Sequence, residues 1–246
     1  MLFRHASAIW RDYPQLSAGA LHLRGVHAQA AVAAHAEPFI ERGRARLAQG
    51  SESELPEIQA WRRAFAGMGV KPTQYRCASE ALLRRLRKDG APPPLHPLID
   101  LCNAVSMAYA IPIAVLDLRH VGSALEVRPA DGTETYLTFS GDTEYPEPGE
   151  VTYADPEGRA HARRWTNRQS GLSAVRDDTR EVLIVAEALH AGAAGDVARL
   201  VDELREVLAR VWQPPQRHAL LTAQAPAFEV QREGTAGAAM AVPVQA

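Results

Sequence analysis

The 246-residue sequence has little of several features that would assign it to a class at once. Its only two cysteines, Cys77 and Cys102, are too few for a disulfide framework, and their spacing does not resemble paired metal ligands. Aromatic residues make up 6%, and 27 lysines and arginines nearly balance 29 aspartates and glutamates, for a formal charge of -2. This balance gives no overall signature of a nucleic-acid-binding protein, so any basic surface must be local.

Several sequence motifs are missing as well. No run approaches the roughly 18 apolar residues of a membrane-spanning helix, and the first residues lack the apolar core of a signal peptide. We therefore predict a cytoplasmic location and no membrane partner. Gly67-Met68-Gly69 follows a predicted helix rather than a strand, so the dinucleotide fingerprint fails in context. The nine histidines are dispersed without metal-ligand spacing, so we expect neither a metal nor another cofactor.

The hydrophobic fraction, 46%, is enough for a sizeable core, and its periodicity changes along the chain. Apolar residues at helical spacing predict helices at 38–49, 54–68, 79–89, 97–111 and 196–212. Ser79 is the expected N-cap of the third helix, and Pro97 the first residue of the fourth.

Alternating patterns predict strands at 21–26, 113–118, 124–128, 134–139, 150–154 and 159–165, and an apolar, central strand at 182–188. Asp131-Gly132 indicates a tight hairpin between two of them. Helices followed by strands and a closing helix predict an α+β fold. We assign 1–213 to one domain and expect 214–246, rich in Ala, Gln, Pro and Gly, to be a disordered tail.

A dense polar segment runs from Arg159 to Thr179. It carries several arginines, a tryptophan and two amides, which could hold a phosphate backbone and stack a base or ribose. The alternative is a solvated hairpin edge protected by its charge. His161 within this segment could act as a general base, but an ordinary exposed histidine is the simpler interpretation.

Other candidates for chemistry are few. Asp100 and Asn103 share a helix face beside a core stripe, where an amide either makes a structural hydrogen bond or lines a pocket. Cys77 and Cys102 lie among apolar helical residues and are expected to be buried, inert thiols. No Gly-x-Ser-x-Gly motif occurs, so covalent catalysis has no support.

Taken in order, short segments of the chain resemble a known family. The segments are Lys71, Arg76 and Ser79-Glu80-Ala81-Leu82; Asp100-Leu101-Cys102-Asn103-Ala104-Val105; Ile111-Pro112-Ile113; Leu116-Asp117-Leu118; Glu126-Val127-Arg128; Ser140-Gly141; and Arg164-Trp165 with Arg168-Gln169-Ser170. Over residues 55–212 they resemble the B3/B4 editing module of the phenylalanyl-tRNA synthetase β subunit, and more closely its free-standing relatives.

This resemblance implies helices packed around an antiparallel β-sandwich of unusual topology. It also implies hydrolysis of the ester between a wrong amino acid and the terminal adenosine of tRNA. Two departures matter: the histidine of the synthetase site aligns with Ala114, and its glutamate falls near Gln169 to Gly171, where this chain has no carboxylate. The catalytic details of the synthetase therefore do not transfer to this chain.

We predict a trans-editing hydrolase that deacylates mischarged aminoacyl-tRNA with a positioned water and neutral or cationic donors. The predicted catalytic residues are Asn103, Gln169, Ser170 and Arg164. The predicted contacts with substrate and the tRNA acceptor end are Lys71, Arg76, Ser79, Asp117, Trp165, Arg168 and Arg163. One alternative is a tRNA- or amino-acid-binding module that lost catalysis, and another is hydrolysis of a small ester or amide unrelated to tRNA.

Overall fold

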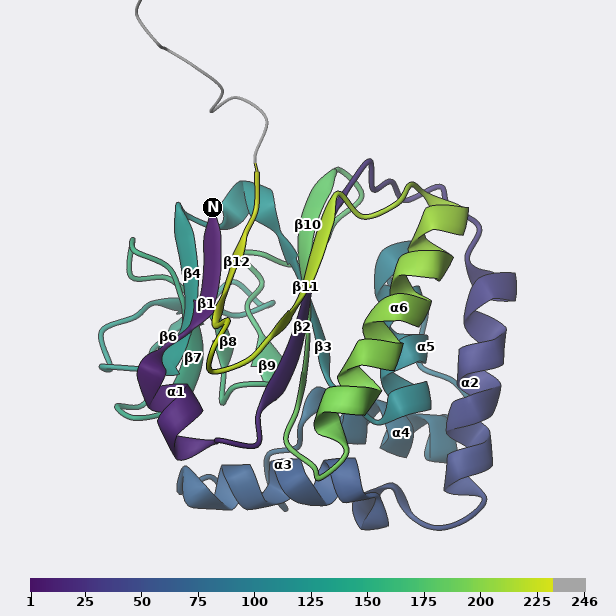
Figure 1. Ribbon diagram of the computed structural model, residues 1–246, viewed down its shortest axis with the longest axis horizontal. Coiled ribbons are helices and arrows are strands. Elements are labelled where there is room, and N and C mark those ends of the chain that lie inside the picture. The colour runs from purple at the N-terminus through teal and green to yellow at the C-terminus, as the bar shows by residue number, and fades with distance from the viewer. Residues whose placement is uncertain (232–246) are drawn as a thin grey trace, which may run out of the picture.

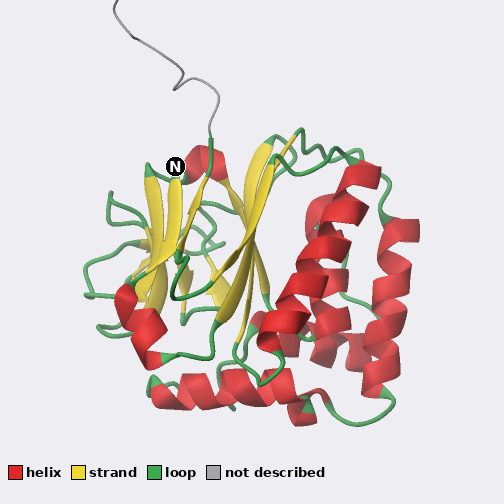
Figure 2. Ribbon diagram, in the orientation of Figure 1, coloured by secondary structure: helices red, strands yellow, loops and turns green. Residues whose placement is uncertain are grey.

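Two large β-sheets, a two-stranded sheet and a layer of helices build the part of the chain that the computed structural model describes, residues 1–231 (Figures 1 and 2). The helices are α1 (Ser7–Asp12), α2 (Ala33–Leu47), α3 (Pro56–Gly67), α4 (Ala78–Asp89), α5 (Pro97–Tyr109) and α6 (Ala193–Val211), with 3₁₀ turns at Glu52–Glu54 and Leu118–His120. The strands are β1 (Leu2–His5), β2 (Ser17–Arg24), β3 (Ile113–Asp117), β4 (Ala124–Pro129), β5 (Tyr136–Leu137), β6 (Thr143–Glu144), β7 (Val151–Ala154), β8 (Ala160–Arg163), β9 (Arg168–Gln169), β10 (Glu181–Ala188), β11 (Arg217–Leu221) and β12 (Ala227–Glu229).

The six-stranded sheet has the order β12-β1-β4-β7-β8-β9, and the four-stranded sheet has the order β11-β2-β10-β3. Strands β1 and β4 are parallel, and the other pairs in these two sheets are antiparallel. One apolar core fills the space between the sheets, and the other lies between the four-stranded sheet and α2, α5 and α6. The layers are thus sheet, sheet and helices, with α3 running along one end (Figure 1).

Helix α6 packs closely on the four-stranded sheet because its buried residues recur at helical spacing. Gly19 of β2 permits this approach, since a Cβ at that position would lie 2.4 Å from Val201 and 3.2 Å from Val197 of α6. A side chain on Gly19 would therefore push the helix off the sheet. Helix α5 begins at Pro97, as predicted, and ends before Ala110, whose φ of 54° turns the chain into Pro112 and β3.

The fold class is α+β, as predicted, and a helix overlaps each of the five predicted ranges. The strand predicted at 182–188 is confirmed as central and buried, because β10 lies between β2 and β3. The strands predicted at 150–154 and 159–165 are present as β7 and β8, which pair antiparallel. Sequence periodicity did not identify β1, α1, β11 or β12.

Three local predictions are wrong. Asp131-Gly132 does not close a tight hairpin: β4 pairs with β1 and β7, while the following strand, β5, pairs with β6. Ser79 is not the N-cap of α4; Cys77 occupies that position, and Ser79 is fully buried in the first turn. His161 is not exposed, because β8 is covered on both faces.

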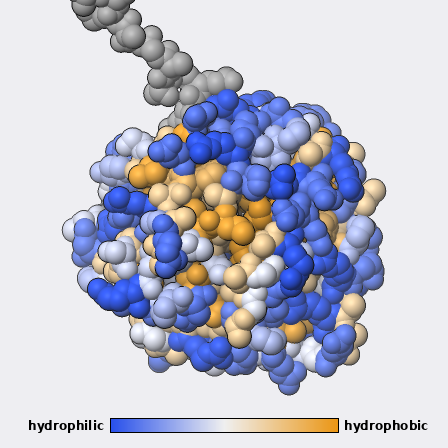
Figure 3. All heavy atoms as spheres, viewed as in Figure 1, coloured by the Kyte–Doolittle hydropathy of each residue, from blue (hydrophilic) through white to orange (hydrophobic). Residues whose placement is uncertain are grey.

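The predicted tail also needs correction. Residues 217–221 and 227–229 form the outer strands of the two sheets, so this part of the 214–246 segment is ordered by backbone pairing with β2 and β1. Apolar side chains gather around β11 on the face seen in Figure 3, where Leu220 is 46% exposed. Residues 232–246 lie outside the described residues.

Candidate active site

A cavity of about 70 Å³ lies between the two sheets, where β3 and β10 face β7, β8 and the turn after β8. Its walls are mostly apolar, and its polar groups come from both sheets and from the turn. The lining residues are Ala78, Pro112, Ile113, Ala114, Leu116, Tyr153, His161, Ala162, Trp165, Thr166, Asn167, Arg168, Gln169 and Glu187. Three residues predicted for the site, Trp165, Arg168 and Gln169, are therefore brought together here.

Glu187 of β10 supplies a buried carboxylate to this cavity. One of its oxygens accepts hydrogen bonds from His5 Nε2 at 2.6 Å and from Trp165 Nε1 at 2.9 Å. The other accepts a hydrogen bond from the hydroxyl of Tyr153. These donors come from three separate segments of the chain, so the carboxylate joins the two sheets by hydrogen bonding.

Tyr153 keeps its proton in this arrangement. Its complete burial, together with the neighbouring Glu187 carboxylate, raises the pKa of Tyr153 well above its ordinary value of 10.0. The phenol therefore donates to Glu187 throughout the neutral pH range. Glu187 was not among the residues predicted from the sequence, although a carboxylate inside the apolar run 182–188 is a signal that could have identified it.

The turn 164–167 fixes one wall of the cavity through an uncommon backbone. Arg164 and Trp165 have φ values of 48° and 57°, in the left-handed region that non-glycine residues rarely occupy. Hydrogen bonds hold this conformation: the Trp165 amide donates to the Val151 carbonyl at 2.6 Å, and the Asn167 side chain donates to the Arg76 carbonyl at 2.7 Å. The two consecutive left-handed residues place the Trp165 indole in the core, whereas the Arg164 side chain is only half-buried.

Trp165 is 1% exposed and packs edge-on against Tyr13 and Trp61. Its indole is therefore a wall of the cavity and is not available to stack on a nucleic-acid base. The Arg164 guanidinium lies 4.0 Å from the ring centre of Tyr75, at the surface. Thr166, the next residue, has a buried hydroxyl oxygen with no hydrogen-bond partner, and it lines the cavity.

Gln169 and Ser170 are adjacent to the cavity, but their side-chain donors are hydrogen-bonded to backbone carbonyls. The Gln169 side-chain amide donates to the Val115 carbonyl at 2.7 Å, and the buried Ser170 hydroxyl donates to the Leu137 carbonyl at 2.9 Å. Their donors fix the position of neighbouring strands. Asn103 lies elsewhere, in a groove between α2 and α5 that Pro92 to Pro94 also line. The structure thus does not bring Asn103 to Gln169.

His161 joins a buried serine and a buried aspartate. Its Nε2 lies 3.0 Å from a carboxylate oxygen of Asp155, and its Nδ1 lies 2.9 Å from the Ser173 hydroxyl. Burial alone would raise the pKa of Asp155, but hydrogen bonds from His161 and Arg159 outweigh it and hold that pKa well below its usual range. The aspartate is therefore ionised, so Nε2 of His161 donates to it. Ser173 is fully buried and does not line the cavity.

Much of the predicted basic cluster is neutralised by nearby carboxylates. Arg163 is buried between Glu150, at 2.9 Å, and Glu144, at 2.8 Å. Arg168, 41% exposed in its side chain, also pairs with Glu144. These pairs offset the charge of Arg163 and Arg168.

The remaining predicted contact residues divide into buried and exposed groups. Ser79 and Asp117 are fully or almost fully buried; Asp117 accepts hydrogen bonds from Arg119 and Thr179 and so stabilises the end of β3. Arg76 is half-buried and lies 3.4 Å from Glu80. Lys71 is exposed on the loop before α4.

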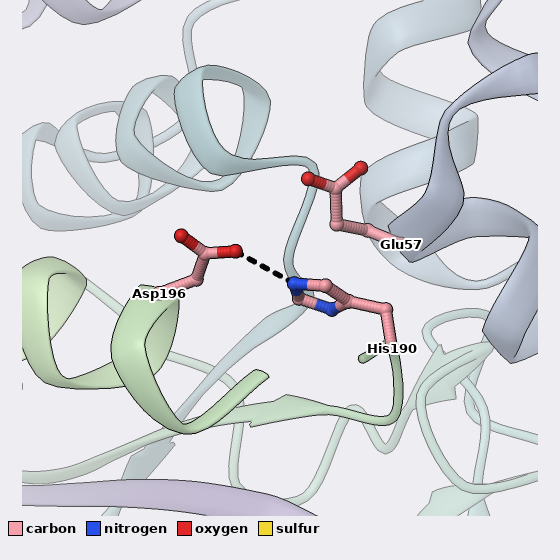
Figure 4. A group of neighbouring side chains, drawn as sticks. All are labelled: Glu57, His190 and Asp196. Carbon is pink, nitrogen blue, oxygen red and sulfur yellow. Dashed lines mark hydrogen bonds and ion pairs between the residues drawn. The ribbon is translucent and has the colours of Figure 1, made fainter. Parts of the chain in front are cut away.

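Glu57, His190 and Asp196 form the one group within residues 1–231 whose spacing would suit a metal ion (Figure 4). His190 Nε2 lies 2.7 Å from Asp196, which also pairs with Arg199, and Arg46 contacts both oxygens of Glu57. Two guanidiniums balance two carboxylates, so no excess negative charge attracts a divalent cation. We assign this group to ion pairing that fixes the start of α6.

The fold and the cavity define an α+β domain with a partly polar cavity between two sheets. Residues 60–210, more than half of the chain, match the family model of the B3/4 domain, and the chain belongs to that family. Some members of the family have editing hydrolase activity. Among residues 1–231, no helix is long and apolar enough to cross a membrane.

Among solved structures, the chain is similar to an N-terminal fragment of the phenylalanyl-tRNA synthetase β subunit from Pyrococcus horikoshii. The two share 13% sequence identity with a TM-score of 0.39, over 47% of this chain and 40% of that chain. No curated protein matches the sequence.

Proposed function

We propose that this protein is a trans-editing deacylase, which hydrolyses the ester of mischarged aminoacyl-tRNA in the cytoplasm. The observation that carries the proposal is the cavity between the sheets, within the B3/4 region, which is lined by the fixed carboxylate of Glu187 and by Thr166, whose buried hydroxyl has no partner. Such a cavity can hold a small amino-acid side chain while the tRNA remains outside. Arg168 lines the cavity, Arg164 lies in the turn after β8, and Lys71 is exposed on the loop before α4, so we assign these three cations to the tRNA phosphates.

The chemistry requires little of the protein, because an aminoacyl ester is already activated. A water held in line with the ester carbon, and a donor for the oxygen that becomes negative, are enough to accelerate hydrolysis. Thr166 lines the cavity, and its hydroxyl oxygen is buried without a hydrogen-bond partner, so we assign this hydroxyl to bind the water or the carbonyl oxygen once the ester is bound. Gln169 would act as a positioning residue, since its amide is bonded to the Val115 carbonyl.

The test is the decay of ester-linked amino acids on a panel of correctly and incorrectly charged tRNAs, with and without the protein. We expect faster loss of a few mischarged species and no effect on the correctly charged ones. Thr166→Val keeps the shape of the side chain and removes the hydroxyl, and should lower the rate on the order of 10²-fold. Thr166→Ser should restore most of it.

One observation favours a non-catalytic function. The side chains of Gln169 and Ser170 donate to backbone carbonyls, so two predicted catalytic donors are occupied. The second candidate is therefore a module that binds the acceptor end of aminoacyl-tRNA without hydrolysing it. Salt-sensitive binding of charged tRNA with unchanged ester lifetimes across the panel would establish this alternative and exclude the deacylase.

A further inference from the structure

The volume of the cavity limits what it can accept. About 70 Å³ is available between the sheets. An engineered protein cavity that binds benzene has a volume of about 150 Å³, and one water occupies at least about 10–15 Å³ measured in this way. The cavity therefore accommodates several waters or a side chain of about three heavy atoms. The benzene-binding cavity has about twice this volume.

Two bulky side chains in the wall of the cavity, Trp165 and Tyr153, are held in place by packing and hydrogen bonds. Trp165 packs edge-on against Trp61, with ring centres 5.0 Å apart, and its Nε1 donates to Glu187. Tyr153 is fully buried, stacks on Phe3 and donates to the same carboxylate. Moving either ring outward to admit a larger ligand would break a buried, charge-assisted hydrogen bond. The size limit is therefore part of the folded core.

Short side chains also line the cavity. Ala114 of β3 and Ala162 of β8 are among its lining residues, as is Thr166, whose hydroxyl oxygen is buried without a hydrogen-bond partner. We propose, building on the proposed deacylase function, that the substrates are tRNAs carrying a small amino acid, from alanine to threonine or valine in size. Phenylalanine and tyrosine are excluded by Trp165 and Tyr153. Ala114 is the residue that sets the upper limit.

The experiment compares one tRNA acylated in turn with alanine, serine, threonine, valine, phenylalanine and tyrosine. Ala114→Val adds two methyl groups to the cavity wall on a strand, where valine is well tolerated. We expect the variant to lose about tenfold or more of its rate on threonyl and valyl esters and less on the alanyl ester, since one methylene in a pocket changes rates by 10–200-fold. Ala124→Val, at the start of β4 and outside the cavity lining, is the matched control and should leave all rates unchanged.

The outcomes separate the size limit from the activity. Hydrolysis of the small esters at least tenfold faster than the aromatic ones supports the inference. Equal or faster hydrolysis of the tyrosyl or phenylalanyl ester overturns the size limit and leaves the deacylase intact. If no ester is hydrolysed, the deacylase proposal fails. The size limit is then decided by the relative binding affinities of non-hydrolysable 3′-amide analogues of alanyl- and tyrosyl-adenosine. Preferential binding of the alanyl analogue supports it, and equal or preferential binding of the tyrosyl analogue overturns it.

Discussion

Replacing Glu187 by alanine removes the acceptor shared by three buried donors. His5 Nε2, Trp165 Nε1 and the Tyr153 hydroxyl would each lose its partner in the core between the sheets. A buried donor left without a partner costs about 1–3 kcal/mol, and breaking a buried charged network by removing one member costs about 3–5 kcal/mol. Because the three donors share one site, their costs do not simply add. We expect Glu187→Ala to lower the free energy of unfolding by about 3–5 kcal/mol.

Two further variants test whether the loss of stability comes from the hydrogen-bond network of Glu187. Tyr153→Phe removes one donor but leaves the carboxylate with two, and should cost about 1–2 kcal/mol. Asp202→Ala, in an exposed pair with Arg205 on α6, should change stability by less than about 0.5 kcal/mol. Urea unfolding followed by tryptophan fluorescence measures all three. A loss below about 1 kcal/mol for Glu187→Ala would refute the account of Glu187 as the link between the sheets.

Burial raises the pKa of Cys77 to about 11 and of Cys102 to about 12, so neither thiol should react with a thiol reagent at pH 8 until the protein unfolds. Asp155 has a lowered pKa when folded, so its contribution to stability is complete above about pH 4 and declines as the pH falls below its unfolded value; Asp155→Asn should flatten the dependence of unfolding free energy on pH between 5 and 2. Asn103→Ala lies in the other groove and should leave deacylation within threefold of the parent protein, whereas a larger loss would place that groove in the site. Arg164→Ala should weaken tRNA binding and reduce the slope of log affinity against log salt by about one, and an unchanged slope would remove it from the interface.

Helices and central strands could be predicted from the sequence because their signals are local. These signals are the apolar stripe of α6, the proline that begins α5 and the apolar run of β10, and each lies within one short stretch of sequence. The short strands β1, β11 and β12 carry no such signal, because they are ordered by pairing with distant partners. The Asp131-Gly132 signal failed for the same reason: turn residues permit a hairpin, but pairing across the sheets decides which strands meet.

For the candidate site, the order of motifs in the sequence predicted a role for the polar segment around Trp165 and Gln169, and both residues line the cavity. The sequence also identifies the family, through residues 60–210. The direction in which each side chain faces follows from packing between distant segments, which buries Trp165 and His161, pairs Arg163 with carboxylates and separates Asn103 from Gln169. That packing also places Glu187 at the centre of a network drawn from β1, β7 and the turn after β8. Local patterns encode which residues can form an element, whereas burial, charge pairing and cavity volume arise from contacts between segments far apart in the chain.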